Sequence, residues 1–256
     1  MVDFAGRGDF SGGEGSVTNP QAIEISLFVL FGLIVALFNI FPAADIEVSR
    51  LFYSGANFPL SHSKFLIFIR DLNRQIPVLV ISYFAFCLAR CWFRPGLPSN
   101  PPPHLCLYVL LSYALGPGLC VQVMKTVFAR SRPHSIFEFG GSHDFTRAAE
   151  LFGTCKASCA FISGEAASAM AMLCLLAAVP QRMRKRAAAV LVSLAVLFSV
   201  NRIVFGAHFL SDVLSSWVLI GLIMLILWRL ISARADTIDS RIQGYMVGRF
   251  QTLGRR

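Results

Sequence analysis

Long apolar runs alternate with short polar stretches along most of this chain. Six runs of about 17–21 residues carry few charged side chains. They cover residues 23–41, 76–93, 105–124, 160–179, 187–205 and 213–231. An α-helix of about 20 residues spans the hydrocarbon core of a bilayer and satisfies its own backbone hydrogen bonds, so such runs are typical of membrane helices. We therefore predict an all-α fold, an integral membrane bundle of six helices.

The polar stretches predict one membrane domain with two tails. Residues 1–20 are polar and rich in glycine and predict a flexible N-terminal tail, residues 21–232 form the membrane domain, and residues 233–256 form a basic C-terminal tail. Within residues 42–75, aromatic and basic side chains favour a short helix at the membrane interface. Gly116-Pro117-Gly118 interrupts the third run and predicts a kink there.

The composition supports a membrane protein and narrows its partners. Of the 256 residues, 55% are hydrophobic and 14% are charged, and the mean hydropathy is +0.64, far more apolar than a soluble domain. The formal net charge of +9 would favour nucleic-acid binding in a soluble protein. Here the basic residues flank the apolar runs, where they orient helices and contact anionic lipid. We expect membrane lipids as partners and no nucleic acid; the sequence does not predict an oligomeric state.

The seven cysteines show no paired Cys-x-x-Cys metal pattern, and the carboxylates form no metal-like cluster. We therefore expect neither a metal nor another cofactor. Cys155 and Cys159 lie in a polar stretch, unlike most of the others. Their spacing is compatible with a disulfide in an oxidising compartment or with two free thiols on one helix face, and we favour the free thiols.

The distribution of Lys and Arg predicts which side of the membrane each polar stretch faces. With six spans and a cytoplasmic N-terminus, the cytoplasmic segments carry slightly more basic residues than the opposite side, and the dense basic loop 181–186 strengthens this bias. The polar stretch 125–159, the start of the fourth run and residues 202–212 then all face away from the cytoplasm. These three segments also hold the residues that suggest chemistry.

The strongest candidate chemistry lies in residues 201–212. His208 and Asp212 are four apart, so on a helix they would share a face and the carboxylate would hydrogen-bond the ring. A histidine oriented by a carboxylate is used as a nucleophile or a general base. Arg202 adds a permanent charge and a planar fork of donors that suits phosphate. The alternative is a loop between two membrane helices with incidental polar residues.

Two further clusters would complete an anion site. Lys125 and Arg132 are seven apart, so one helical face would present both cations to a phosphate ester; the alternative is a basic cluster at the membrane surface. Ser163 and Gly164 begin the fourth run, where backbone N–H groups at a helix N-terminus bind anions. The alternative there is an ordinary helix start with Ser163 as N-cap and Glu165 in the first turn.

In chain order, the patterns Lys-x6-Arg-Pro, Ser-Gly and Arg-x5-His-x3-Asp resemble the motifs of the type 2 phosphatidic acid phosphatase superfamily, over roughly residues 105–231. These membrane lipid phosphate phosphatases have active sites related to those of vanadium haloperoxidases. The resemblance implies a non-cytoplasmic site and hydrolysis through a phosphohistidine without a metal, with His208 as nucleophile and Asp212 orienting it. The residues that it implies for phosphate binding are Lys125, Arg132, Ser163, Gly164 and Arg202.

The middle motif departs from the family pattern Pro-Ser-Gly-His. Ile162 stands where Pro is usual, Glu165 where His is usual, and Asn201 replaces the usual Ser of the third motif. In the family that His protonates the leaving group. Three interpretations stay open: Glu165 is the acid, if burial keeps it protonated; His134 or His143 is the acid; or the protein binds lipid phosphate without catalysis.

The Ser-Gly-Glu form resembles bacterial members of the family that act on lipid A, in particular those that remove its 4'-phosphate. We therefore predict a phosphoric monoester hydrolase of the bacterial inner membrane whose site faces the periplasm and which modifies lipopolysaccharide. Lipid A 4'-phosphate is the favoured substrate. Alternatives within the class are lipid A 1-phosphate, undecaprenyl diphosphate, phosphatidate and phosphatidylglycerol phosphate, or phosphoryl transfer to another lipid.

Two arginines near the motifs receive a simpler interpretation. We predict that Arg130 and Arg147 are solvated surface residues, and the alternative is contact with a second phosphate or a head group.

Overall fold

The computed structural model describes residues 19–93, 100–151, 153, 155 and 159–242. Its main helices are α1 (Pro20–Ile40), α2 (Ala43–Arg50), α3 (Lys64–Phe93), α4 (Pro103–Tyr113), α5 (Val121–Phe128), α6 (Gly164–Ala171), α7 (Gln181–Val204) and α8 (Leu210–Ser232). These ranges contain no β-strand, so the prediction of an all-α fold is confirmed. Most of the two predicted tails, residues 1–18 and 243–256, lies outside the described residues.

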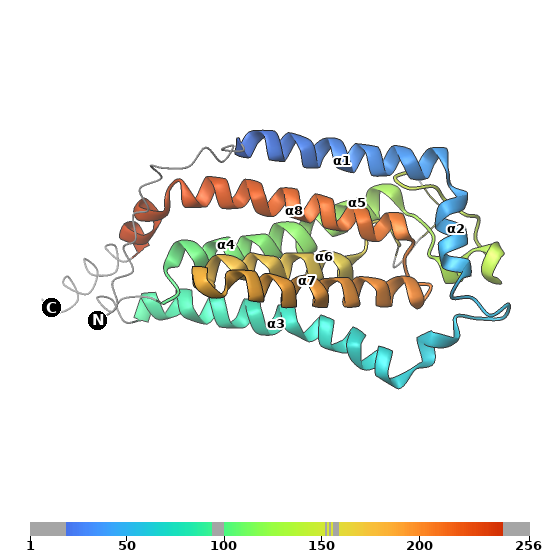
Figure 1. Cartoon of the computed structure of the whole chain (residues 1–256), viewed down its shortest axis with the longest axis horizontal. Helices are drawn as coiled ribbons and strands as arrows, with labels where there is room; N and C mark the ends of the chain where they lie inside the picture. The colour runs from blue at the N-terminus through green and yellow to red at the C-terminus, as the bar shows by residue number, and fades with distance from the viewer. Residues whose placement is uncertain (1–18, 94–99, 152, 154, 156–158, 243–256) are drawn as a thin grey trace, which may run out of the picture.

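Five helical segments are long and apolar enough to cross a membrane: residues 20–40, 64–91, 103–135, 181–204 and 210–232. The sixth predicted span is a shorter apolar segment, in which α6 continues into a 3-10 helix, Met172–Ala178. Figure 1 shows these segments side by side along the long axis of the molecule. The membrane bundle is therefore confirmed, although length alone supports five of the six predicted spans.

The second span begins earlier than predicted, because α3 starts at Lys64 and includes the polar residues 70–74. Arg70 pairs with its neighbour Asp71 at 2.8 Å. Asn73 is buried and donates from Nδ2 to the backbone oxygen of Glu165 at 3.1 Å. Such contacts satisfy polar groups that would otherwise favour a loop. The longer helix carries residues 70–74 to the end of the bundle where the motifs lie.

The interruption predicted at Gly116-Pro117-Gly118 is a π-helical segment, Ala114–Cys120, that joins α4 to α5. Pro117 has no N–H to donate, and the wider turn accommodates this loss. A Cβ on Gly116 would lie 3.3 Å from Cδ1 of Ile220, so the glycine permits close packing of this segment on α8.

The core surrounds α8, which packs against α1, α4 and α6. Ile220 and Met224 of α8 lie in one buried cluster with Val109 of α4. Most large apolar side chains of α1 are exposed instead, among them Phe28 and Leu33. This distribution is typical of a helix that faces lipid on its outer side.

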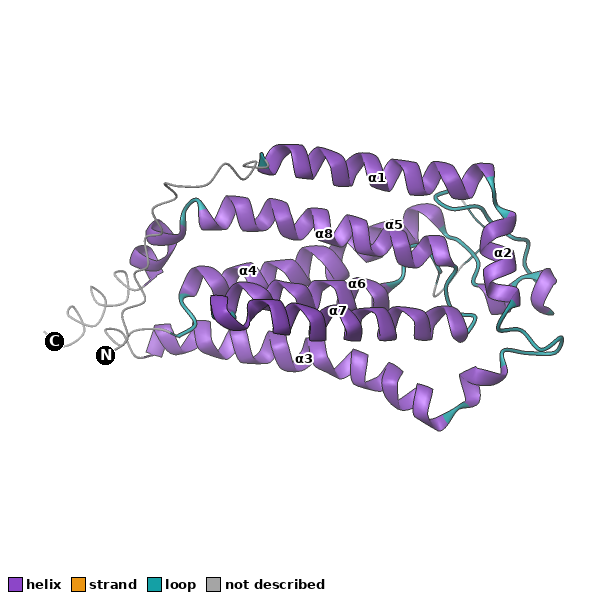
Figure 2. Ribbon diagram, viewed as in Figure 1, coloured by secondary structure: helices purple, strands orange, loops and turns teal. Residues whose placement is uncertain are grey.

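The short helix predicted within residues 42–75 is present as α2, which lies across one end of the bundle (Figure 2). The loops that join α5 to α6 and α7 to α8 lie beside it. Asp45 and Ser49 of α2 are buried, whereas Glu47 and Arg50 are exposed. One polar face of α2 is therefore turned into the bundle.

Cys155 and Cys159 form a disulfide, so the preference for two free thiols was wrong. Both residues lie in the long connection between α5 and α6. Neither Cys155 nor Cys159 is helical, so the two thiols do not lie on a helix face as the alternative required.

Candidate active site

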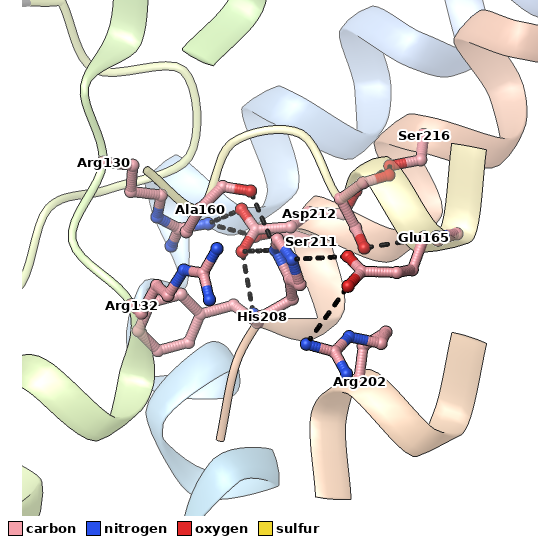
Figure 3. A network of polar contacts seen from close by, with 12 residues as sticks. Arg130, Arg132, Ala160, Glu165, Arg202, His208, Ser211, Asp212 and Ser216 are labelled. Atoms are coloured by element: carbon pink, nitrogen blue, oxygen red, sulfur yellow. Dashed lines mark hydrogen bonds and ion pairs between the residues drawn. The ribbon is translucent and has the colours of Figure 1, made fainter. Parts of the chain in front are cut away.

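Residues of all three motifs come together at the end of the bundle beside α2 (Figure 3). They belong to the loop after α5, the first turn of α6, the last turn of α7 and the start of α8. His208 and Asp212 are fully buried and Arg202 is nearly so. Segments that lie far apart in the sequence thus build one enclosed polar cluster in an otherwise apolar protein.

His208 is held mainly by the backbone. Its Nδ1 lies 2.9 Å from the carbonyl oxygen of Ala160, whereas Oδ2 of Asp212 lies 3.8 Å from the same nitrogen. The direct hydrogen bond expected between the two side chains is therefore replaced by an electrostatic contact. The reason is local: α8 begins at Leu210, so His208 precedes the helix and the four-residue spacing does not place it on a helical face with Asp212.

Both carboxylate oxygens of Asp212 accept hydrogen bonds from groups other than His208. Oδ1 accepts from Nη1 of Arg130 at 2.6 Å, and Oδ2 accepts from the backbone N–H of Phe209 at 2.8 Å. Asp212 thereby closes the first turn of α8 and remains close enough to His208 to stabilise a positive charge on the ring.

Glu165 faces His208 and two arginines. Its Oε2 lies 3.7 Å from Nε2 of His208, and its Oε1 lies 3.5 Å from Nη2 of Arg202 and 2.9 Å from Nη2 of Arg74. Nε and Nη1 of Arg202 and Nε2 of His208 are buried and have no hydrogen-bond partner among the described residues. Buried donors without acceptors are costly, so the two unpaired donors of Arg202 can bind an anion.

The Ser-Gly motif begins α6 as expected of a helix start. Ser163 is the N-cap, and its Oγ accepts from the backbone N–H of Ala166 at 3.3 Å. A Cβ on Gly164 would lie 3.7 Å from Nζ of Lys125, so the ammonium group lies over this helix N-terminus. Both the N-cap interpretation and a role in anion binding are compatible with this arrangement.

Lys125 and Arg132 do not share a helical face, contrary to prediction. α5 ends at Phe128, and Ala129 adopts a left-handed conformation with φ of 43°, which stops the helix. Arg132 instead lies on the following loop, and its guanidinium points toward His208 (Figure 3). The two cations therefore approach the site from different elements.

The two alternative acids lie on the same loop. Nδ1 of His134 lies 2.9 Å from the carbonyl oxygen of Gly206, and Nδ1 of His143 lies 3.3 Å from that of Ser135. Of the three candidates, Glu165 makes an ion-pair contact with His208. The expectation that burial keeps Glu165 protonated was wrong for the free site, because Arg74 and Arg202 favour its carboxylate form.

Arg130 was predicted to be solvated and is instead fully buried. It donates from Nη2 to Oδ2 of Asp45 at 2.8 Å and from Nη1 to Asp212, and its guanidinium lies 4.3 Å from the ring centroid of Phe209. The two carboxylates provide the reason for burial, because they compensate its charge. Burial raises the pKa of the Asp45 carboxyl above its ordinary value, against the opposing charge of Arg130. Arg147 is exposed, as predicted.

Sequence reasoning missed three residues of this region: Asp45, Asn73 and Arg74. They belong to α2 and α3, far from the motifs in the sequence. In the sequence, Asp45 and Arg74 stand out only as charged residues beside apolar runs. Their charge indicates that each needs a partner but does not identify that partner.

A profile of the PAP2 superfamily matches residues 104–236. This range covers α4 to α8 and leaves out α1 to α3. Two lipid A 4'-phosphatases are similar in sequence. The one from Rhizobium leguminosarum is 35% identical over 206 residues, which cover 75% of this chain and 88% of that protein. The one from Rhizobium etli is 34% identical over 206 residues, covering 75% of this chain and 80% of that protein.

One solved structure is similar in fold. It is the crystal structure of a transmembrane PAP2-type phosphatidylglycerolphosphate phosphatase from Bacillus subtilis, with a TM-score of 0.55 and 21% sequence identity. The match covers 84% of this chain and 96% of that one. At this identity the likeness bears on the fold alone, and it extends over the membrane bundle as a whole.

Proposed function

The chain belongs to the PAP2 superfamily and is a phosphoric monoester hydrolase, and from this premise we propose that it removes the 4'-phosphate of lipid A. We place the reaction at the periplasmic face of a bacterial inner membrane. The substrate is supported by the two lipid A 4'-phosphatases that match three quarters of the chain, together with the Ser-Gly-Glu form of the middle motif.

The observation that carries the chemistry is the set of buried nitrogens without hydrogen-bond partners around one carboxylate. Nε and Nη1 of Arg202 offer two donors, and Nε2 of His208 lies on the other side of Glu165. A phosphate group supplies acceptor oxygens for the arginine fork and an electrophilic phosphorus for the imidazole. Lys125 and Arg132 add the charge that the equatorial oxygens need in the transition state.

His208 is the nucleophile in this scheme. Nδ1 donates to the carbonyl of Ala160, so the lone pair lies on Nε2, which faces the space where phosphorus would lie. Nε2 forms the N–P bond as the bond from phosphorus to the sugar oxygen breaks. The charge of Asp212, 3.8 Å from Nδ1, stabilises the phosphohistidine imidazolium.

Glu165 is our candidate for proton transfer. Its carboxyl group gives a proton to the departing sugar oxygen. Water then attacks the phosphohistidine, the N–P bond breaks, and the proton from water returns to Glu165 as phosphate leaves. The distance of 3.7 Å between Oε2 and Nε2 of His208 supports this role.

The placement at the periplasmic face rests on charge. The basic segment 181–186 begins α7 at the end of the bundle opposite α2 and the site (Figure 1). If this segment remains in the cytoplasm, as the positive-inside rule expects, the site lies on the other side of the membrane.

Mass spectrometry of lipid A from a lipopolysaccharide-bearing host that expresses the chain tests the proposal. We expect loss of one phosphate, with fragment ions that assign the loss to the 4' position, and no loss with the His208→Ala variant. Loss from the 1 position would replace the proposed substrate. If lipid A keeps both phosphates while a prenyl or glycerol phosphate is hydrolysed, lipid A is the wrong substrate.

A further inference from the structure

We propose that Glu165 is a resident anion in the phosphate site of the free enzyme, and that Arg74 of α3 keeps it in place when phosphate enters. This inference rests on the proposed phosphatase chemistry. It gives a role to α3, which lies outside the range 104–236 matched by the family profile. Arg74 is a positioning residue in this scheme, because it acts through Glu165.

The contacts of Glu165 are those of an anion bound by the site. Oε1 accepts from Nη2 of Arg74 at 2.9 Å and faces Nη2 of Arg202 at 3.5 Å. Oε2 lies 3.7 Å from Nε2 of His208. The side chain is only 16% exposed, so the carboxylate is enclosed by groups that a phosphate would use. A carboxylate and a phosphate present the same kind of acceptor oxygens to a guanidinium.

Phosphate cannot enter without changing these contacts. In-line attack places phosphorus about 3–3.5 Å from the attacking nitrogen, in the space that Oε2 of Glu165 now borders. The ammonium of Lys125 lies over the N-terminus of α6, and the guanidinium of Arg132 points toward His208 (Figure 3), so both anions compete for the same cations. Two anionic groups in contact share a proton rather than remain fully charged. Entry of the phosphate monoanion therefore separates Glu165 from Arg202, and the proton of the phosphate passes to the carboxylate of Glu165 beside the leaving group.

The hydrogen bond between Arg74 and Glu165 can persist when phosphate binds. Its side chain is 51% exposed, whereas that of Arg202 is 4% exposed, so Arg74 lies at the rim of the site. The preceding residue, Asn73, is buried and binds the backbone oxygen of Glu165. Adjacent residues of α3 thus hold both the main chain and the side chain of Glu165, which limits how far the carboxyl group moves when it is displaced.

A double-mutant cycle on the binding of inorganic phosphate tests this arrangement without a lipid substrate. The full chain, purified in detergent, is titrated with phosphate in a calorimeter as wild type, Glu165→Gln, Arg74→Gln and the double variant. Removal of the competing carboxylate should tighten phosphate binding about tenfold, equivalent to about 1.4 kcal/mol. Arg74→Gln should weaken it about fivefold, because Glu165 then stays on Arg202 and His208.

The decisive comparison is the effect of Arg74→Gln in the Glu165→Gln background, where we expect a change within about twofold. Equal weakening in both backgrounds would mean that Arg74 binds phosphate itself and would overturn the positioning role. Unchanged or weaker binding by Glu165→Gln, or no binding by any variant, would overturn the resident-anion role. A merely structural role of Arg74 predicts no dependence on the residue at position 165.

Two further variants sharpen the test. Arg74→Lys keeps the charge and should recover most of the affinity. Arg70→Gln is the matched control, because Arg70 lies one turn earlier on α3 and pairs with Asp71 rather than with Glu165; it should bind phosphate like the wild type. If the cycle behaves as expected and lipid A is not dephosphorylated, the substrate proposal fails while the inference on Arg74 stands.

Discussion

Nδ1 of His208 lies 2.9 Å from the carbonyl oxygen of Ala160. Because a carbonyl oxygen only accepts hydrogen bonds, this contact places the ring proton on Nδ1 and leaves the lone pair on Nε2. Nε2 is the nitrogen that faces Glu165. In the proposed mechanism, the main chain therefore selects Nε2 as the attacking nitrogen, and the carboxylate of Asp212 lies 3.8 Å from Nδ1.

Replacement of His208 by Gln should abolish phosphate release, because the amide nitrogen of Gln is not nucleophilic and cannot attack phosphorus in place of the imidazole. We expect a loss of about four orders of magnitude or more in kcat, as for other catalytic nucleophiles. The measurement is release of inorganic phosphate, together with rapid-quench trapping of an acid-labile labelled phosphoenzyme from a substrate carrying phosphorus-32.

The matched control for this prediction is His143→Gln. His143 lies on the loop after α5 and contacts the carbonyl oxygen of Ser135, so its loss should leave the labelled phosphoenzyme unchanged. A labelled phosphoenzyme that persists in the His208 variant would exclude His208 as the nucleophile.

Replacement of Glu165 by Gln should reduce kcat by about 10²–10⁴-fold, the usual contribution of a general acid. A residue that donates a proton works only below its own pKa, so its loss removes the alkaline limb of the pH profile of kcat. The pH dependence of phosphate release by the wild type and the variant checks this.

His134→Gln separates the alternatives for the acid. The wild-type profile should persist in this variant, because the imidazole of His134 binds the carbonyl oxygen of Gly206. An alkaline limb that survives in Glu165→Gln and disappears in His134→Gln would assign proton transfer to the histidine.

The helices of the bundle could be predicted from the sequence because apolar runs of membrane length constrain the backbone locally. The contact between His208 and Asp212 could not, because it depends on where α8 begins. The spacing of four would produce a hydrogen bond on a helix, but the helix starts at Leu210. The group that binds Nδ1 is the backbone oxygen of Ala160, and a main-chain atom has no sequence signature.

The partners of Arg130 and Arg74 could not be predicted from the sequence either, because they lie on other helices. Arg130 was predicted to be solvated, yet it is buried against Asp45, which is 85 residues away in the sequence. Arg74 was placed in a connection, yet it lies on α3 and contacts Glu165. A charged side chain beside apolar runs needs a partner of opposite charge, and only the tertiary structure identifies that partner.

Arg130→Met should lower the free energy of unfolding by about 3–5 kcal/mol, because it leaves two buried carboxylates without their cation. Nη1 and Nη2 of Arg130 bind Asp212 and Asp45 at 2.6 and 2.8 Å. Thermal unfolding in detergent measures the loss. Addition of Asp45→Asn to Arg130→Met should recover part of the stability, since it removes one uncompensated charge.

Arg147→Met is the control for Arg130. Arg147 is exposed and belongs to the same connection between α5 and α6, so its replacement should change the free energy of unfolding by less than about 0.5 kcal/mol. Equal effects of the two replacements would show that the buried ion pairs of Arg130 do not stabilise the fold.

Asp45 makes the stability of the bundle depend on pH. Burial raises the pKa of its carboxyl above the ordinary value of 3.8, although the charge of Arg130 opposes this shift. A carboxyl group whose pKa is higher in the folded state binds its proton more tightly there. Its contribution to stability is therefore complete below the pKa of the unfolded state and is lost as the pH rises through the pKa of the folded state.

Asp45→Asn removes this titration, so the variant should gain stability relative to the wild type as the pH rises from about 4 to about 7. The unfolding midpoint of both proteins, measured in one detergent across this range, gives the difference. Glu47→Gln on the exposed side of α2 should show no such trend. A difference between Asp45→Asn and wild type that does not change with pH would mean that Asp45 titrates alike in the folded and unfolded chain, and that Arg130 fully offsets the cost of its burial.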